Sequence, residues 1–287
     1  MNRIVVLGSN GFLGTALNEN LSKTNLHVRY MIHTKNKKLK NNEFYGDILD
    51  QNILLKNLHD NDVVVNLVGQ YDKNFSRFFD ANLKGSFNLL ETAKKKKNLK
   101  IIFASSINVY GENCKQNSKE TDLPNPMTEY GIVKFLTEQL YEKYSKLFGL
   151  NVIILRFSNI YGKNKKTGLI SNIVNSTPKK PALISNNGNQ LRDFLHVDDA
   201  AKGIIRAIKT NSKNFDVFNI ASGEQISPNH IIQLIQKQSK QKIYFKLYKQ
   251  KLDERCISAN PSKASRKLKF SPKIDLNNGL NLIFNNL

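Results

Sequence analysis

Residues 4–14 read IVVLGSNGFLG, and this stretch decides the fold class. Its first four residues, Ile4–Leu7, are apolar and predict a buried strand, and helical spacing of apolar residues begins at Phe12. Three glycines, spaced three residues apart, separate the two elements. Glycine lets the backbone turn tightly and approach a pyrophosphate, which the N-terminus of the following helix then faces. Such a pattern also fits a plain turn, but its place between a strand and a helix favours a dinucleotide-binding site.

Strands and helices alternate through the first half of the chain. The predicted strands are Ile4–Leu7, Val28–Ile32, Val63–Val68, Ile101–Ala104 and Val152–Phe157, and the predicted helices are Phe12–Ser22, Ile53–Leu58, Phe78–Lys95 and Tyr130–Leu147. This alternation predicts a parallel sheet with helices on both faces, a doubly wound α/β fold of the Rossmann type.

The chain is less regular after Asn159, where Gly, Asn, Ser and Pro become more frequent. The elements expected there are a helix over Val197–Lys209, a strand over Phe215–Ile220, a helix over Pro228–Gln238 and a short strand around Ile243–Leu247. We predict an NAD(P)-binding domain over residues 1–158, with a returning segment near 192–221, and a smaller C-terminal substrate domain over residues 159–287. Without a flexible linker the two should pack together, and the cleft between them is the expected ligand site.

Composition narrows the class of protein. Of 287 residues, 40% are hydrophobic, which is enough for a core, and 44 Lys and Arg against 23 Asp and Glu give a net charge of +21. A basic balance can indicate nucleic-acid binding, but the excess is mostly dispersed lysine, so a solvated surface that favours small anions is the preferred interpretation. We expect no nucleic-acid partner.

Targeting and covalent features are few. No run approaches the roughly 18 apolar residues of a membrane helix, and the apolar start is too short for a signal peptide, so we expect no membrane association and a cytoplasmic location. The two cysteines, Cys114 and Cys256, lie far apart without metal-ligand spacing. Neither a disulfide framework nor a metal site is predicted.

Tyr130 and Lys134 carry the predicted chemistry. They are four residues apart in a segment with helical spacing, which puts them on one face, one turn apart. A lysine ammonium there favours the phenolate and lowers a pKa that is about 10 when unperturbed. The pairing is also common by chance. A catalytic role for the pair is favoured by Ser106, which follows the predicted strand Ile101–Ala104 and can hydrogen-bond a reacting oxygen.

The choice of cofactor depends on the end of the second strand. An acidic residue there would bind the adenosine ribose of NAD, but residues 28–35 contain none. His33 and Lys35 can instead face a ribose 2′-phosphate, so we favour NADP, with NAD as the alternative. Asp47 is a candidate for binding the adenine ring, or is a turn aspartate.

Taken together, the motifs resemble those of the extended short-chain dehydrogenase/reductase family, which includes nucleotide-sugar epimerases, dehydratases and 4-ketoreductases. The resemblance covers nearly the whole chain. It rests on Gly8–Gly14, Gly46–Ile48, Asn82–Ser86, Ser105–Gly111, Tyr130–Lys134, Leu155–Gly162, Arg192–Asp199, Phe218–Gly223 and Ser262–Ala264, in family order.

The resemblance implies roles for individual residues. Ser106 aligns with the catalytic Ser or Thr, Tyr130 with the acid/base, and Lys134 with the residue that binds the nicotinamide ribose and tunes the tyrosine. The implied cofactor-binding positions are Gly8, Asn10, Gly11, Phe12, Leu13, Gly14, His33, Lys35, Asp47, Ile48, Leu67, Val68, Gly69 and Asn82, together with Tyr130 and Lys134.

For the substrate, Asn159 and Arg192 fall where the family holds a diphosphate, and an arginine fork suits phosphate oxygens. Ser106 would also contact the substrate. The family's second phosphate-binding arginine is replaced by Gln250, and we expect the nearby Arg255 to contribute.

Departures from the family pattern narrow the expected reaction. Ile107 and Asn108 follow Ser106 where sugar dehydratases carry Asp-Glu, so a dehydratase is disfavoured. The missing acid after the second strand counts against a 4-epimerase. We therefore expect an NAD(P)-dependent oxidoreductase that reduces a nucleotide-linked 4-keto-6-deoxyhexose. An NAD-dependent nucleotide-sugar 4-epimerase is the first alternative, and a non-catalytic cofactor sensor or nucleic-acid-binding protein is the second.

The family also implies an assembly. Its members often form homodimers through a four-helix contact, which here would use the predicted helices Phe78–Lys95 and Tyr130–Leu147. A homodimer is therefore expected.

Overall fold

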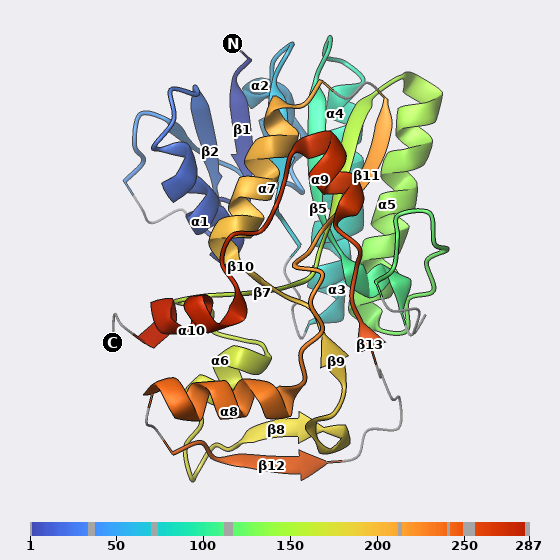
Figure 1. The fold of residues 1–287 in the computed structure, drawn as a ribbon. Coiled ribbons are helices and arrows are strands. Elements are labelled where there is room, and N and C mark those ends of the chain that lie inside the picture. The colour runs from blue at the N-terminus through green and yellow to red at the C-terminus, as the bar shows by residue number, and fades with distance from the viewer. Residues whose placement is uncertain are drawn as a thin grey trace.

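A computed structural model describes residues 2–33, 38–69, 74–111, 117–211, 214–239, 242–248 and 256–284. Its largest feature is a seven-stranded sheet in the order β11-β6-β5-β4-β1-β2-β3, with every neighbouring pair parallel (Figure 1). The strands are β1 (Ile4–Leu7), β2 (Val28–Ile32), β3 (Glu43–Tyr45), β4 (Val63–Asn66), β5 (Lys100–Ser106), β6 (Asn151–Phe157) and β11 (Phe215–Ile220). The predicted α/β fold with a Rossmann-type parallel sheet is confirmed.

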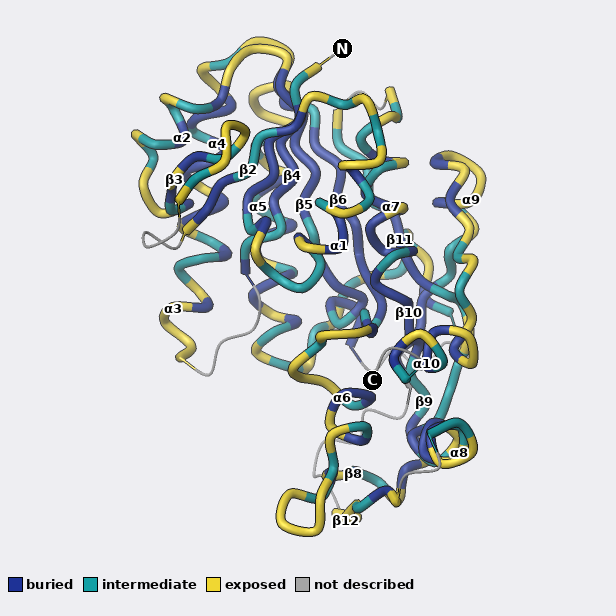
Figure 2. The backbone as a smooth tube through the Cα atoms, turned by 90° about the vertical axis from the view of Figure 1, so that its left-hand side faces the viewer, coloured by how far each residue is buried: buried dark blue, intermediate teal, exposed yellow. Residues whose placement is uncertain are grey.

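Helices cover both faces of this sheet. One face carries α1 (Phe12–Leu21), α7 (Val197–Lys209) and α9 (Ser262–Leu268), and the other carries α2 (Gln51–Asn57), α4 (Gly85–Ala93) and α5 (Glu129–Phe148). Side chains of β1 alternate between the two cores, with Ile4 and Val6 in one and Val5 and Leu7 in the other. Because both faces are covered, the central strands β1, β4, β5 and β6 are buried along nearly their whole length and are mostly apolar, whereas the outer strands β2, β3 and β11 are partly exposed (Figure 2).

The chain changes direction across the sheet between β1 and β4. From β1 it runs outward through β2 and β3, and it then returns to place β4 on the other side of β1. Ligands of open α/β sheets bind at such a switch point, beyond the carboxyl ends of the strands. The glycine turn that follows β1, residues Gly8–Gly14, lies at this position.

The predicted helix over Phe78–Lys95 has an irregular centre. It consists of α3 (Phe75–Phe79), a π-helical turn over Asp80–Lys84 and α4. The Asn82 side-chain Nδ2 donates to the Phe78 carbonyl at 2.8 Å, the carbonyl that the backbone N–H of residue 82 would take in a regular α-helix. π-Turns of this kind are frequent at functional sites.

A second core lies beyond the sheet's carboxyl edge. Its elements are β7 (Asn159–Tyr161), α6 (Leu169–Val174), β8 (Ala182–Ser185), β9 (Leu191–Arg192), β10 (Phe194–His196), α8 (Pro228–Ser239), β12 (Phe245–Tyr248), β13 (Cys256–Ile257) and α10 (Leu276–Phe284). The strands form the parallel pairs β10-β7, β12-β8 and β13-β9. The predicted helices and strands after residue 190 are present, but most of the short strands here were not predicted, and the domain limits at residues 158 and 159 remain a prediction.

Lys100 joins the sheet to the end of α7. Its Nζ donates to the carbonyls of Ala207 at 2.6 Å, Ile208 at 3.2 Å and Thr210 at 2.6 Å, and the side chain is buried. These carbonyls belong to the last turn of the helix, where backbone acceptors lack helical partners.

We expect Lys100→Met to lower the free energy of unfolding by about 1–3 kcal/mol, because it removes the three hydrogen bonds from the lysine to these carbonyls. Urea denaturation followed by circular dichroism measures the change. Lys97→Met, at an exposed position three residues earlier, is the control and should change stability by no more than about 0.5 kcal/mol. Equal midpoints for the two variants would show that Lys100 does not hold the helix end.

Candidate active site

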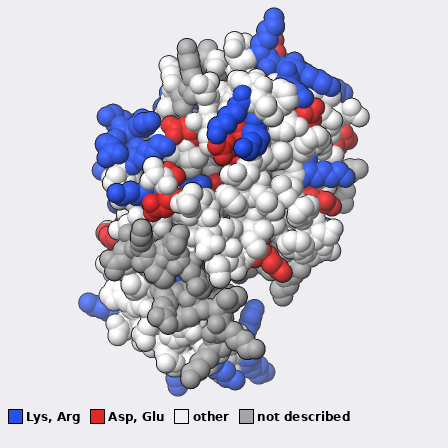
Figure 3. Space-filling view, turned by 90° about the vertical axis from the view of Figure 1, so that its right-hand side faces the viewer, with Lys and Arg blue, Asp and Glu red and all other residues white. Residues whose placement is uncertain are grey.

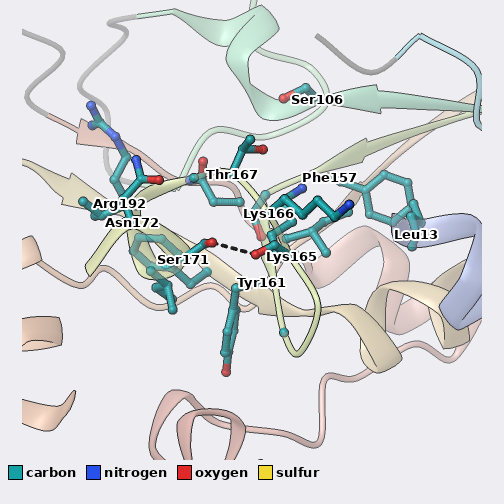
Figure 4. A pocket seen from close by; sticks show the side chains of 18 of the residues that line it. Leu13, Ser106, Phe157, Tyr161, Lys165, Lys166, Thr167, Ser171, Asn172 and Arg192 are labelled. Atoms are coloured by element: carbon teal, nitrogen blue, oxygen red, sulfur yellow. Dashed lines mark hydrogen bonds between the residues drawn. The ribbon is translucent and has the colours of Figure 1, made fainter. Parts of the chain in front are cut away.

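A cavity of about 1050 Å³ opens at the carboxyl edge of the sheet, between the sheet and the second core (Figure 4). Its lining combines the end of β5, the start of α5, the segment from β6 through α6, and residues of β8 and β9. Its volume is at the upper end of the range typical for small-molecule sites. The cavity therefore has room for a ligand as large as a nucleotide sugar.

The lining of this cavity is strongly cationic. It includes Lys134, Lys163, Lys165, Lys166, Lys180 and Arg192, whereas no Asp or Glu is among the described lining residues. In the view of Figure 4, Lys165 and Lys166 lie between Leu13 and Arg192. Concentrated positive charge in a concave site attracts anions such as a diphosphate.

Tyr130 enters the cavity from the first turn of α5. The helix begins there because Thr128 caps it, with its Oγ1 accepting from the Gly131 N–H at 3.1 Å. The Phe78 ring stacks on the Tyr130 ring, with centroids 5.7 Å apart. Burial raises the pKa of Tyr130 to about 12, and a hydrogen bond with Ser106 partly opposes this rise.

Lys134 lies one turn further along α5. Its Nζ donates to the Ala104 carbonyl at 3.1 Å and lies 5.9 Å from the centroid of the Tyr130 ring. Burial lowers the pKa of Lys134 to about 7, while the charge of Glu138 acts in the opposite direction. The pKa of Tyr130 is therefore raised, where the spacing to Lys134 led us to expect it lowered, because burial is the largest effect on the phenol. A phenol and an amine with displaced pKa values in one cavity can form a proton-transfer pair.

Ser106 completes this group at the end of β5. Its Oγ accepts from the Asn108 N–H at 3.2 Å, which caps the short helix Ile107–Tyr110. The structure therefore brings Ser106, Tyr130 and Lys134 together in one cavity, as expected, and their catalytic roles remain predictions.

The glycine turn has the form that a bound dinucleotide needs. Gly8 has φ +79, and a Cβ at Gly14 would lie 2.4 Å from the Gly8 carbonyl oxygen. No side chain caps the N-terminus of α1 at Gly11. Its backbone N–H groups are thus available to a phosphate, and the residues fit a pyrophosphate.

Other predicted cofactor positions extend from this turn. Leu13, Leu67 and Gly69 line the cavity, and a Cβ at Gly69 would lie 2.2 Å from Asn82 Oδ1. Within the described part of the chain, this buried oxygen accepts no hydrogen bond. An unsatisfied buried acceptor at this place can take a hydrogen bond from a bound cofactor, so Asn82 fits its predicted role.

The residues predicted to bind the adenosine half of the cofactor include an acid at the end of β2, which was not expected there. His33 follows β2, and its Nε2 lies 3.1 Å from Oδ2 of Asp47, which follows β3. The structure thus brings a carboxylate to the end of β2 from the neighbouring strand, where sequence order gave none. Ile48 is buried against Gly85, and Val68 donates its N–H to the Asn66 side chain. Lys35 lies outside the described residues.

Of the predicted substrate residues, Asn159 and Arg192 line the cavity. The Asn159 Nδ2 donates to the Asp193 carbonyl at 2.9 Å, which holds its side chain in place. Arg255 lies outside the described residues.

Two further cofactor positions lie on or beside the glycine turn. Asn10 is exposed on this turn, and Phe12 lies under Lys165, whose Nζ is 4.7 Å from the ring centroid.

The loop over residues 162–168, which supplies three of the cavity's lysines, was not predicted as part of the site. The Lys165 carbonyl accepts from Ser171 Oγ at 2.6 Å, the dashed line in Figure 4. A concentration of lysines directly after Tyr161 and Gly162 was the available signal, but their place at the cavity depends on tertiary contacts. The buried pair of Glu138 and Arg156 was also not predicted, although Glu138 continues the four-residue spacing of Tyr130 and Lys134.

Comparison with known proteins identifies the family. The model of the NAD dependent epimerase/dehydratase family matches residues 4–221. The chain belongs to this family. The family implied by the sequence motifs is therefore confirmed.

Relatives of this family member are known in several organisms. It is 32% identical to a Methanocaldococcus jannaschii protein provisionally named UDP-glucose 4-epimerase, over 98% of this chain and 97% of that one. A Thermotoga maritima UDP-glucose 4-epimerase, solved with UDP-glucose, is 28% identical, with a TM-score of 0.87 over 99% and 97% of the two chains. A Bacillus cereus UDP-glucuronic acid 4-epimerase, solved with UDP-glucuronic acid and NAD, is 29% identical, with a TM-score of 0.86 over 99% and 98%.

These relatives bear on the expected reaction. Each carries the name of a 4-epimerase, so they favour the first alternative over the reductase, which is not confirmed. The Bacillus cereus structure holds NAD, and the preference for NADP is likewise not confirmed. What the comparisons establish for this chain is an NAD-dependent type of nucleotide-sugar enzyme.

Proposed function

We propose that this protein is an NAD-dependent 4-epimerase of a UDP-linked sugar. The observation that carries the proposal is the half-buried Tyr130 beside Lys134 and Ser106, in a cation-lined cavity next to the glycine turn. The names of its relatives support the reaction and the nucleotide.

In the proposed mechanism, Tyr130 exchanges a proton with the C4 hydroxyl of the sugar. Its phenolate removes the hydroxyl proton, and Ser106 orients the oxygen by a hydrogen bond. Lys134, when charged, stabilises the phenolate. NAD, when bound, supplies a reversible hydride acceptor for C4. After the 4-keto sugar turns over in the cavity, Tyr130 returns the proton to the oxygen of the inverted alcohol.

The remaining residues of the site would bind the cofactor and the sugar nucleotide and align them. The N–H groups at the start of α1 would hold the cofactor pyrophosphate, and Asp47 would meet the adenosine end. Asn159, Arg192 and Arg255 would hold the diphosphate of the sugar nucleotide, with Lys163 and Lys166 adding positive charge. Alignment of this kind removes several kcal/mol, up to roughly 7–11, from a barrier.

A carboxylate beside the adenosine ribose favours NAD because it repels a 2′-phosphate. Asp47 meets His33 at the end of β2, and a carboxylate at this strand end supports NAD over the NADP that the sequence favoured. Mass spectrometry of the nucleotide retained by gently purified protein tests this choice. Recovery of NADP would contradict it.

The reaction is tested by incubating the protein with UDP-glucose and, separately, with UDP-glucuronic acid. We expect NMR spectroscopy to detect the C4 epimer of at least one of them, with no net formation of NADH. A reductase would instead consume reduced cofactor in proportion to a 4-keto-6-deoxy sugar. Turnover of that sugar, without epimerisation of either test substrate, would overturn the proposal.

A nucleic-acid partner is not part of the proposal. On the face shown in Figure 3, Lys and Arg form separate groups with Asp and Glu between them, and no continuous basic stripe is visible. Dispersed charge of this kind suits a solvated surface better than a phosphate backbone.

No helix in the described ranges has the length and apolar character needed to cross a bilayer. The cytoplasmic location remains a prediction.

A homodimer through α4 and α5 is proposed from exposed apolar side chains on these helices. Phe87, Ile132, Leu136, Leu147 and Phe148 are between 43% and 73% exposed. Phe87 and Phe148 both contact the Tyr144 ring, with centroids 6.1 and 5.2 Å away, so apolar groups of the two helices adjoin. Adjoining exposed apolar side chains of this size mark protein interfaces.

We expect the wild-type protein to sediment as a dimer at micromolar concentration and Leu136→Glu as a monomer, because a charge in the centre of an apolar interface is not solvated. Leu282→Glu is the matched control, since Leu282 is 44% exposed on α10 against 43% for Leu136. A wild-type monomer, or a dimer that survives Leu136→Glu, would contradict this interface.

A further inference from the structure

Behind the cavity, a buried carboxylate on α5 joins this helix to two strands of the sheet, β5 and β6. Glu138 is 2% exposed, and its Oε1 accepts from Ser105 Oγ at 2.5 Å. Arg156 donates from Nη2 to Oε2 at 2.6 Å and from Nε to both carboxylate oxygens at 3.1 Å. Arg156 is itself 5% exposed. The pair is thus held by several charge-assisted hydrogen bonds away from solvent.

The position of Glu138 relates it to the proposed catalytic residues. Tyr130, Lys134 and Glu138 follow one another at four-residue intervals along one face of α5. Ser105 directly precedes Ser106 on β5, and Arg156 pairs with Ser105 in the register of β5 and β6. One carboxylate therefore ties the helix that carries Tyr130 and Lys134 to the strand that carries Ser106.

Glu138 is also the acid that acts on Lys134. The described groups around Lys134 are the Ala104 carbonyl, the Phe103 and Tyr130 rings and the Glu138 carboxylate. The Arg156 guanidinium, on the other side of its bonds to Glu138, lies 4.8 Å from the Tyr110 ring centroid, and Tyr110 donates to Asn219 at 2.7 Å. A carboxylate one turn away favours the charged lysine, and a charged lysine favours the phenolate.

Stability alone does not account for this arrangement. A buried ion pair loses much of its attraction to desolvation, and apolar residues of similar volume often serve a core equally well. Placed directly behind the reacting groups, the pair has a positional and electrostatic use instead.

We propose that Glu138, held by Arg156 and Ser105, is a positioning residue that fixes Ser106 against Tyr130 and keeps Lys134 charged beside it. This inference rests on the proposed epimerase function for its kinetic consequence, although its electrostatic consequence can be measured without any sugar substrate.

The electrostatic part is tested with the double variant Glu138→Gln/Arg156→Met, which removes both charges and leaves no unpaired ion. The readout is the pH titration of tyrosinate absorbance in the NAD-loaded protein, with the signal of Tyr130→Phe subtracted to isolate Tyr130. We expect the midpoint of Tyr130 to rise by about one pH unit. Glu142→Gln, one turn further along α5 and paired with Lys146 at the surface, should leave it in place. An unchanged midpoint in the double variant would overturn this part.

The positional part is tested with Ser105→Ala, which keeps both charges and removes the hydroxyl that links strand and helix. We expect kcat for C4 epimerisation to fall about tenfold at unchanged KM, because misplacement of a reacting group costs rate more than binding. A wild-type kcat in this variant would refute the link. If the wild-type protein epimerises no sugar nucleotide, the proposed function fails, whereas the tyrosinate titration still decides whether Glu138 acts on the pair.

Discussion

Tyr130→Phe should lower the rate of C4 epimerisation by about 10³-fold or more, the largest effect expected of any single substitution. General acid–base groups typically contribute about 10²–10⁴-fold to rate, and in the proposed mechanism one phenol both removes and returns the proton. The ring would still stack on Phe78, so the fold and the cavity should be retained. Loss of turnover with unchanged retention of NAD is the expected combination, measured by NMR of the sugar nucleotide and by cofactor analysis.

Tyr144→Phe is the matched control for this substitution. Tyr144 lies on the same helix, donates to Glu91 at 2.8 Å and does not line the cavity. Its loss should leave turnover within a factor of a few of the wild-type rate. If Tyr130→Phe retains more than about a tenth of wild-type activity, another group transfers the proton and the assignment of Tyr130 is wrong.

Lys134→Met should lower turnover at neutral pH by about 10²-fold and should also change its dependence on pH. Burial raises the pKa of Tyr130 to about 12 and lowers that of Lys134 to about 7. As a coupled pair, the two groups release their first proton near pH 7, and it comes mainly from Lys134; the minor form in which Tyr130 has lost it and Lys134 has kept it is the proposed base. Wild-type activity should therefore rise as pH increases through about 7.

Without the lysine, only the phenol titrates. The rising part of the pH–rate profile of Lys134→Met should therefore move towards pH 12, and its activity should recover in part under alkaline conditions. A pH–rate profile of kcat tests this directly. Lys146→Met, an exposed lysine of the same helix, should keep the wild-type profile. A uniform loss of activity at every pH would show that Lys134 only binds the cofactor.

Much of the sheet could be predicted because its strands are buried on both faces. Such strands are short apolar runs, and the helices between them repeat apolar residues at helical spacing, so both signals are local. Val28–Ile32 and Phe215–Ile220 have the predicted limits. The break in the helix over residues 75–93 was not predictable, because it depends on how the Asn82 side chain bonds to the backbone.

The candidate site likewise contains residues that local patterns predict and residues that only tertiary contacts bring together. The glycine turn, the Tyr130 and Lys134 spacing and Ser106 at a strand end are short patterns, so they could be found along the chain. The pairing of His33 with Asp47 and the loop of lysines above Phe12 were missed, because each depends on contacts between separate elements.

The sequence by itself determined the α/β class, the glycine turn and the helical face that carries the proposed acid/base, since each is encoded within one or two turns of chain. Only the tertiary structure decided that Glu138 meets Ser105 and Arg156, that six cations surround one cavity free of described acids, and that Asp47 reaches the end of β2. These contacts join residues brought together by strand order and register. Local propensity does not specify which strands become neighbours, and that order fixes the electrostatics of the site.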